Sequence, residues 1–261
     1  MILDIKGKVA IVTGASKGMG YSVCEALVSE GVKVMMVSRN EKVLKELKDK
    51  FSKQNIEVDY FTGDVSSPHL HDKVIEKTLS LWGSIDILVN NAGGPSMGSF
   101  LEKNDSDWES AIQTNLMSVI RFSKAVTSHM KINKWGRIIS ITSSLAIEPS
   151  PLMVLSSTVR AGVSSFTKAI STELAESNIT VNVICPGGVL TERLKSLIDD
   201  RTLREDRDYE DILKENQSSI PIKRFASSKE IADTILFLVS KRASYITGVS
   251  LPVDGGLLKS Y

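Results

Sequence analysis

Residues that build metal sites or disulfides are few in this sequence. It has two cysteines and three histidines. Cys24 and Cys185 both stand among apolar residues, so we expect core thiols rather than a disulfide. His69, His71 and His129 show no spacing typical of metal ligands. We therefore expect no metal site.

Long apolar runs and an excess of charge of either sign are also missing. No apolar run approaches the roughly 20 residues of a membrane-spanning helix, and the first residues show no signal-peptide pattern. The formal net charge is +1, which gives no field to attract nucleic acid or an anionic membrane. We therefore expect a cytoplasmic protein that binds neither.

Apolar, β-branched segments alternate regularly with amphipathic ones. The predicted strands are residues 9–13, 33–37, 57–61, 85–90, 137–141, 180–185 and 249–253, and the predicted helices are residues 21–30, 41–53, 70–81, 107–130, 159–176 and 229–239. Continuously apolar strands separated by helices indicate a parallel sheet with helices on both faces. We predict a single α/β domain over residues 1–261, a Rossmann-type doubly wound sheet whose ligand lies at the carboxyl ends of the strands.

A glycine-rich turn is the most informative local feature. Residues 9–20 read VAIVTGASKGMG, with Gly14, Gly18 and Gly20 between an apolar run and the amphipathic residues 21–30. Glycine lets the backbone turn tightly and approach a ligand, and the following helix offers unpaired N–H groups to an anion such as a pyrophosphate. The alternative is an ordinary strand-to-helix turn, but the strand before it and the helix after it favour nucleotide binding.

Residues 191–219 interrupt the pattern with a charged stretch. Its charged residues include Arg201, Arg204, Glu205, Asp206, Arg207 and Asp208. Such an insertion is either a solvated surface segment or a mobile lid, and its place after the sixth strand favours a substrate lid.

Several motifs occur in a recognisable order. They are Thr13-Gly14-x3-Gly18-x-Gly20, Asp64-Val65, Asn90-Asn91-Ala92-Gly93, Asn115, Ser143, Pro186-Gly187, Thr191 and Val253-Asp254-Gly255-Gly256. In this order and at this spacing, the chain resembles the short-chain dehydrogenase/reductase family from end to end. It is most similar to the 3-oxoacyl-(acyl carrier protein) reductase and glucose dehydrogenase branches. The resemblance implies an oxidoreductase that interconverts a carbonyl and an alcohol with a nicotinamide cofactor.

The resemblance also implies where the cofactor binds. The expected cofactor-binding residues are Gly14, Ser16, Lys17, Gly18, Met19, Gly20, Ser38, Arg39, Asp64, Val65, Asn91, Ala92, Gly93, Arg160, Pro186, Gly187, Val189 and Thr191. A carboxylate ending the second strand would bind the ribose 2′-hydroxyl of NAD, whereas a cation suits the 2′-phosphate of NADP. Arg39 stands there and Lys17 lies in the glycine turn, which favours NADP(H) over NAD(H). The alternative is that both are solvated surface cations.

The expected catalytic group departs from the family. There, a serine is followed thirteen positions later by a tyrosine, which exchanges a proton with the substrate, and four positions after that by a lysine. Counting from Ser143 gives Ser156 and Arg160, so the Tyr-x3-Lys pair is replaced by Ser-x3-Arg. With Asn115, these three residues are the candidate catalytic residues.

The replacement leaves the proton donor unidentified. A serine hydroxyl is a poor general acid near neutral pH, and arginine does not release its proton. Glu148 and Tyr209 are the candidate substitutes. Two functions stay open: an NADP(H)-dependent oxidoreductase with an atypical site, and a non-catalytic cofactor-binding protein that acts as a sensor or assembly partner. A charged lid suits sugars, acyl thioesters and small ketones alike.

The resemblance finally implies self-association. Members of the family use the surfaces that correspond to residues 156–176 and 249–261 to form tetramers with two-fold axes. We therefore expect a homotetramer, with a dimer as the next choice.

Overall fold

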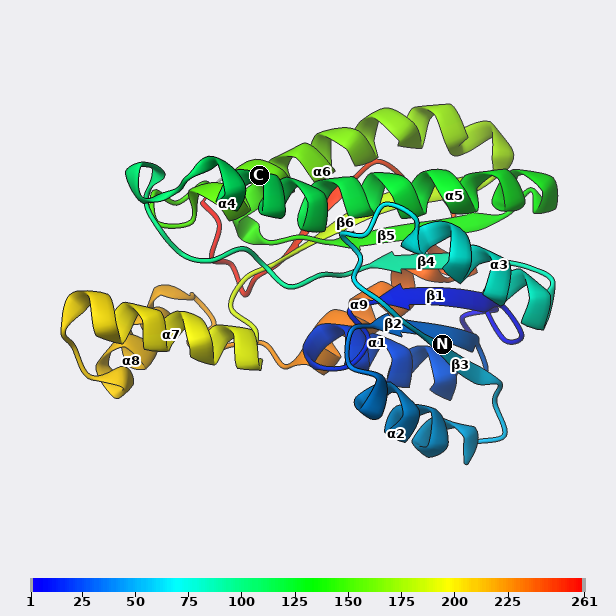
Figure 1. The fold of residues 1–261 in the computed structure, drawn as a ribbon, viewed down its shortest axis with the longest axis horizontal. Helices are drawn as coiled ribbons and strands as arrows, with labels where there is room; N and C mark the ends of the chain where they lie inside the picture. The colour runs from blue at the N-terminus through cyan, green and yellow to red at the C-terminus, as the bar shows by residue number, and fades with distance from the viewer. Residues whose placement is uncertain (1, 260–261) are drawn as a thin grey trace.

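A seven-stranded parallel sheet forms the centre of the computed structural model, which describes residues 2–259 (Figure 1). The strands are β1 (Val9–Thr13), β2 (Lys33–Ser38), β3 (Val58–Thr62), β4 (Ile87–Asn90), β5 (Gly136–Ile141), β6 (Ile179–Pro186) and β7 (Ser250–Val253). Their order is β3-β2-β1-β4-β5-β6-β7, so β3 and β7 are the edges. The predicted single-domain, doubly wound α/β fold is confirmed.

Helices cover both faces of the sheet, as Figure 1 shows. On one face lie α1 (Gly18–Ser29), α2 (Glu41–Ser52) and α9 (Ser228–Val239), and on the other α3 (Leu70–Trp82), α5 (Ser118–Asn133) and α6 (Val154–Leu174). In β1, Ala10 and Val12 join the core beneath α1 and α9, whereas Ile11 joins the core beneath α3 and α5. Because successive side chains of a strand point to opposite faces, a strand buried on both sides must be apolar throughout.

The helix predicted over residues 107–130 is in fact three segments. These are α4 (Asp105–Ile112), a π-helical turn (Gln113–Met117) and α5. Asn104 ends the preceding loop, because its side chain accepts a hydrogen bond from the Asp107 backbone N–H at 3.1 Å and thereby caps α4. The π turn adds a residue to the helical repeat, and apolar spacing alone does not reveal it.

Two predicted helices begin earlier than expected. The helix expected over residues 21–30 begins at Gly18, and the one expected over residues 159–176 begins at Val154. Residues 191–219, for which no helix was predicted, form α7 (Glu192–Glu205) and α8 (Tyr209–Ser219). In Figure 1, α7 and α8 project from the body of the domain.

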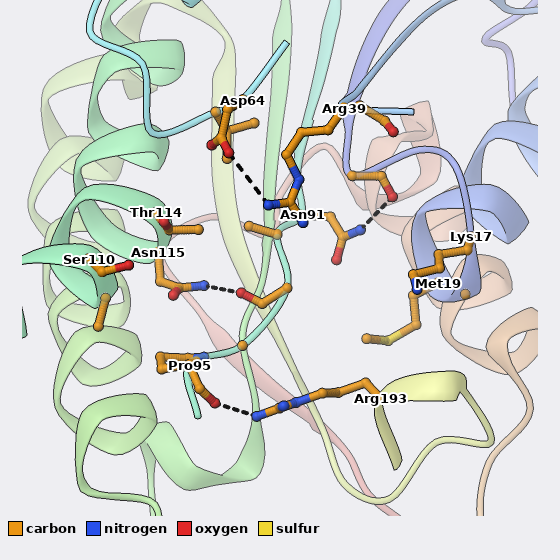
Figure 2. Close-up of a pocket in the computed structure, with 18 of the residues that line it drawn as sticks. Lys17, Met19, Arg39, Asp64, Asn91, Pro95, Ser110, Thr114, Asn115 and Arg193 are labelled. Atoms are coloured by element: carbon orange, nitrogen blue, oxygen red, sulfur yellow. Dashed lines mark hydrogen bonds and ion pairs between the residues drawn. The ribbon is translucent and has the colours of Figure 1, made fainter. Parts of the chain in front are cut away.

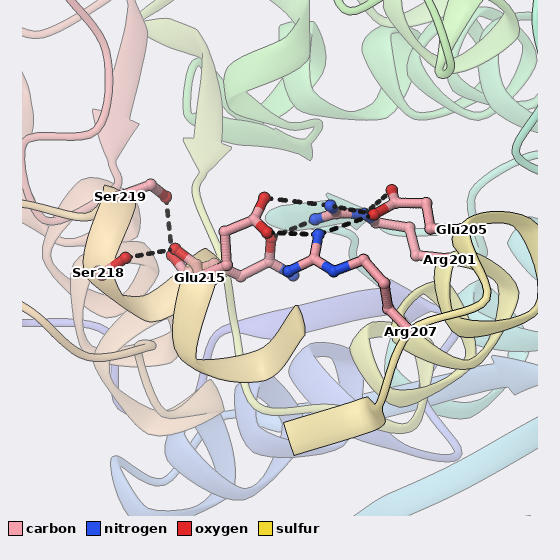
Figure 3. Close-up of polar contacts among 7 residues, drawn as sticks. Arg201, Glu205, Arg207, Glu215, Ser218 and Ser219 are labelled. Carbon is pink, nitrogen blue, oxygen red and sulfur yellow. Dashed lines mark hydrogen bonds and ion pairs between the residues drawn. The ribbon is translucent and has the colours of Figure 1, made fainter. Parts of the chain in front are cut away.

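Ion pairs join α7 to α8 (Figure 3). Arg201 Nη2 lies 3.1 Å from Glu215 Oε1, and Arg207 Nη1 lies 2.7 Å from Glu215 Oε2 and 3.0 Å from Glu205 Oε2. These four charged residues therefore pair with one another, which fixes the two helices as one unit.

Two expectations about composition can be compared with the structure. Cys24 and Cys185 are buried free thiols, as predicted, and burial raises the pKa of each. Within residues 2–259, no helix combines the length and apolar character needed to cross a membrane.

Candidate active site

The turn after β1 has no room for a side chain at Gly14 or at Gly20. A Cβ on Gly14, where φ is +59°, would lie 2.7 Å from the carbonyl oxygen of Asn91, and a Cβ on Gly20 would lie 2.2 Å from the carbonyl oxygen of Gly14. Real Cβ atoms do not approach backbone so closely. Glycine at these positions therefore lets α1 begin directly against the end of β1.

The amino-terminal end of α1 is free to attract an anion. Its N-cap is Lys17, whose side chain makes no capping hydrogen bond, and its first turn contains no acid. The first N–H groups of a helix have no partners within the helix, and they attract negative charge. Gly18 and Met19 of this turn line a cavity, so the residues present fit a pyrophosphate.

That cavity has a volume of about 440 Å³ and lies where the strand order reverses, between the loops that follow β1 and β4 (Figure 2). This is where doubly wound sheets bind ligands. The predicted site residues that line it are Gly14, Ser16, Lys17, Gly18, Met19, Ser38, Arg39, Asp64, Val65, Asn91, Ala92, Gly93, Asn115, Arg160 and Thr191.

Hydrogen bonds fix the loop after β4. Thr13 Oγ1 donates to the Asn91 carbonyl at 2.8 Å, and the Asn91 amide donates to Thr13 Oγ1 at 2.9 Å. Asn115, in the π turn, donates from Nδ2 to the Gly93 carbonyl at 2.8 Å. Asn115 therefore holds the wall of the cavity in place, and the π turn brings it there.

At one end of the cavity, Arg39 extends over the opening towards Asp64 (Figure 2). Its Nη1 lies 3.5 Å from Asp64 Oδ2, and its side chain is 81% exposed. Burial raises the pKa of Asp64, but hydrogen bonds from Ser66 and the charge of Arg39 outweigh it and hold the pKa below its usual value. Lys17 also has a carboxylate partner, Glu192 Oε2 at 2.5 Å.

Arg160 lies at the other end. Its Nε donates to Ser156 Oγ at 3.0 Å, and its Nη1 donates to the Ile141 carbonyl at 3.3 Å. Burial, together with the charge of Arg193, lowers the pKa of Arg160 to about 10. Ser156 is buried beneath this guanidinium and does not line the cavity.

Some predicted site residues do not line the cavity. These are Gly20, Ser143, Ser156, Pro186, Gly187 and Val189. Ser143 Oγ accepts a hydrogen bond from the Leu145 backbone N–H at 3.3 Å, so it caps a short 3-10 helix, Ser144–Ala146. A Cβ on Gly187 would lie 2.9 Å from Asp254 Cα, so this glycine allows close packing at the ends of β6 and β7.

Neither proposed substitute for the missing acid lies in the cavity. Glu148 Oε1 accepts a hydrogen bond from the Lys259 backbone N–H at 2.7 Å. Tyr209 begins α8, and neither residue lines the cavity.

The cavity also has lining residues that we did not predict. They are Gly63, Gly94, Pro95, Ser96, Asp107, Ser110, Ala111, Thr114, Leu155, Glu192 and Arg193. Asp107, Ser110 and Thr114 recur at helical spacing ahead of Asn115, a polar stripe that the sequence displays. Arg193 follows the predicted site residue Thr191 by two residues, and this closeness in sequence could have pointed to Arg193 as a lining residue.

Comparison with known proteins identifies the family of this chain. A sequence model described as short chain dehydrogenase matches residues 8–202. The chain belongs to the short-chain dehydrogenase family. It is 35% identical to the 3-oxoacyl-(acyl carrier protein) reductase FabG of Salmonella typhimurium over 255 residues, which cover 98% of this chain and 99% of the relative.

Solved structures of reductases resemble this short-chain dehydrogenase closely. The L-sorbose reductase of Gluconobacter frateurii, in complex with NADPH and L-sorbose, superposes with a TM-score of 0.94 at 33% identity and covers 100% of both chains. YwfH, an NADPH-dependent reductase involved in bacilysin biosynthesis, gives a TM-score of 0.93 at 32% identity and covers 97% of this chain and 99% of its own. The family resemblance inferred from the motifs is confirmed, and the chain is an oxidoreductase of this family.

Proposed function

We propose that the chain is an NADP(H)-dependent oxidoreductase that interconverts a carbonyl compound and an alcohol, with Ser156 and Arg160 at the positions of the family's tyrosine and lysine. The observation that carries this proposal is the fixed Arg160 guanidinium at one end of a cleft whose other end fits a dinucleotide. Named relatives reduce 3-oxoacyl groups and bind L-sorbose, which supports a small carbonyl substrate.

The residues of the cleft fit NADP(H). The N-terminus of α1 would take the pyrophosphate, Arg39 and Lys17 the 2′-phosphate, and Asp64 the adenine side. Strand β2 ends in Ser38 and is followed directly by Arg39 and Asn40 rather than by a carboxylate, which favours the phosphorylated cofactor. When bound, the cofactor supplies or accepts the hydride.

Arg160 would act as a fixed hydrogen-bond donor. Even with its pKa lowered by burial to about 10, Arg160 keeps its proton near pH 7, so it would polarise a carbonyl oxygen without supplying the proton. Ser156 acts through Arg160 and is a positioning residue. We assign the proton to water in the cleft, because Glu148 and Tyr209 do not line it.

Residues 191–219 would serve as the substrate lid. Two consecutive residues at the start of α7 contact opposite walls of the cleft: Glu192 pairs with Lys17, and Arg193 Nη2 donates to the Pro95 carbonyl. The ion pairs between α7 and α8 let both helices move as one body.

A turnover assay tests the function. We expect NADPH to be consumed slowly with 3-oxoacyl thioesters, ketoses or small ketones, because general acid catalysis contributes typically ~10²–10⁴-fold and the usual acid is absent. Arg160→Gln should lower the rate further. The matched control is Arg242→Gln, which removes an exposed arginine that donates to the Ile2 carbonyl outside the cleft. Tight NADPH binding with no carbonyl reduced would instead indicate the non-catalytic cofactor-binding protein.

We also propose a homotetramer, supported by the outer face of α6. This face exposes small residues at helical spacing, Ala161, Ser165, Ala169 and Thr172, which let a second helix approach closely. The other expected surface, residues 249–261, begins in the edge strand β7, and its last two residues lie outside the described part of the chain.

Light scattering checks this assembly. We expect a mass close to four times 28.5 kDa, which should fall when Ala161 and Ala169 are replaced together by Arg, since two long cations would separate the facing helices. The control is Lys124→Glu, an exposed substitution on α5. A mass of one chain over a wide concentration range would contradict the proposal.

A further inference from the structure

Arg160 and Arg193 face the same small volume of the cleft, although they lie on different elements. A Cβ placed on Gly94 would lie 3.3 Å from Arg160 Nη2 and 3.6 Å from both Nε and Nη2 of Arg193. All three residues line the cavity. The absence of a side chain at position 94 therefore leaves a space bordered by two guanidinium groups.

Most N–H groups of the two guanidiniums make no hydrogen bond within the described part of the protein. Arg160 donates from Nε to Ser156 Oγ and from Nη1 to the Ile141 carbonyl. Arg193 donates from Nη2 to the Pro95 carbonyl. A guanidinium has five N–H groups. Most donors of the pair are therefore left for a ligand.

The positive charges of Arg160 and Arg193 are also not balanced by ion pairs within residues 2–259. Within residues 2–259, no carboxylate forms an ion pair with Arg160 or Arg193, whereas Arg201 and Arg204, further along α7, pair with glutamates at 2.7 and 2.9 Å. Burial lowers the pKa of Arg193, and Asp200 offsets this only in part. Two partly buried like charges that face one space destabilise each other, and an anion between them removes that cost.

We propose that Arg160 and Arg193 bind the carboxylate of an anionic carbonyl substrate, an oxo acid, with Arg193 supplied by the lid. This inference rests on the proposed function and names the substrate class of the same site. A carboxylate accepts paired N–H groups from guanidinium forks, which is the geometry that arginine provides and lysine does not.

Other anions are less suited to this position. The phosphates of the cofactor have their own partners, the N-terminus of α1 and Arg39. The remaining walls nearby include Ser110, Thr114 and Leu155, which suit a short chain with one or two polar groups. Asp107 also lines the cavity, and its carboxylate accepts a hydrogen bond from the Asn104 backbone N–H at 3.1 Å.

The test uses a redox-inert pair of probes, oxamate and its neutral counterpart oxamide. Calorimetric titration of the full-length protein, with and without NADPH, should show oxamate binding at least about tenfold more tightly than oxamide. Arg193→Gln should abolish that ratio, and Arg193→Lys should retain only part of it. The matched control, Lys195→Gln, removes the same charge from an exposed position on α7 and should leave the ratio unchanged.

A second variant tests whether the space beside Gly94 is where the carboxylate binds. Gly94→Ala places a methyl group against both guanidiniums, so it should weaken oxamate binding at least about tenfold while NADPH binding persists. Equal binding of oxamate and oxamide to the parent protein, or oxamate affinity unchanged in Arg193→Gln or Gly94→Ala, would overturn the proposal.

The same measurements separate this inference from the proposed function. Oxamate binding by a protein that does not bind NADPH would refute the function and leave the carboxylate site standing. Turnover of 2-oxobutanoate and its methyl ester at equal kcat/KM would refute the carboxylate site and leave the function standing. If both hold, Arg193→Gln should act mainly by raising the KM for the acid.

Discussion

Replacing Ser156 with tyrosine and Arg160 with lysine together should raise carbonyl-reductase activity on a neutral ketone by the ~10²–10⁴-fold typical of a general acid. The double variant restores a phenol and the cation that lowers its pKa, beside a cofactor cleft and an Asn115 that are already in place. The rate of NADPH consumption at saturating ketone measures the change.

Single substitutions are the controls. Ser156→Tyr alone lacks the lysine, and Arg160→Lys alone lacks the phenol, so each should gain far less than the pair, because residues that act as a unit are not additive. Ser156 is 4% exposed, so thermal unfolding must show that the tyrosine is accommodated. If the parent and a folded double variant both bind NADPH and neither reduces a carbonyl, the proposed function is wrong. If the parent turns over and Ser156→Ala changes nothing, Ser156 does not position Arg160.

Arg39→Asp should reverse the cofactor preference. Loss of charge-assisted hydrogen bonds to the 2′-phosphate costs about 1.5–3 kcal/mol, and the new carboxylate repels the phosphate, so NADPH affinity should fall by about 10²-fold. NADH should bind more tightly, because a carboxylate there accepts hydrogen bonds from the ribose hydroxyl. Fluorescence titration with both cofactors measures the ratio.

The matched control for this reversal is Lys42→Asp. Lys42 is an exposed cation of α2 that does not line the cavity, and the same change of charge there should leave the NADPH to NADH ratio nearly unchanged. A ratio unchanged in Arg39→Asp would show that Arg39 does not bind the phosphate.

Sequence patterns predicted the parts of this molecule that depend on local chemistry. The continuous apolar strands gave the parallel sheet, because burial on both faces of β1 demands Ala10, Ile11 and Val12. The glycine turn was predicted from Gly14, Gly18 and Gly20 between a strand and a helix, and in the structure a Cβ on Gly14 or Gly20 would meet backbone atoms. Both patterns can be read within a short stretch of the chain.

Features that arise from contacts distant in sequence were missed. The π turn that carries Asn115 is stabilised where that side chain reaches Gly93, and no local pattern encodes this contact. Arg193 reaches the cleft because Thr191 caps α7, which begins at Glu192, and the Arg193 side chain then extends to the Pro95 carbonyl. The space at Gly94 exists only because two arginines from different elements border it.

The edge strand β7 has a consequence for how copies of this chain can meet. The carbonyls of Val249 and Val253 accept hydrogen bonds from Val183 of β6 and from Gly187 just after it, at 2.8 and 3.1 Å. Successive residues of a strand face alternate sides, so the backbone of Pro252 faces the open edge. Proline has no N–H to offer there. Another strand therefore cannot extend the sheet at this edge through a full ladder of hydrogen bonds, which protects the protein against edge-to-edge aggregation. Copies that meet near β7 therefore cannot depend on a continuous backbone ladder, and side chains must supply most of the contact.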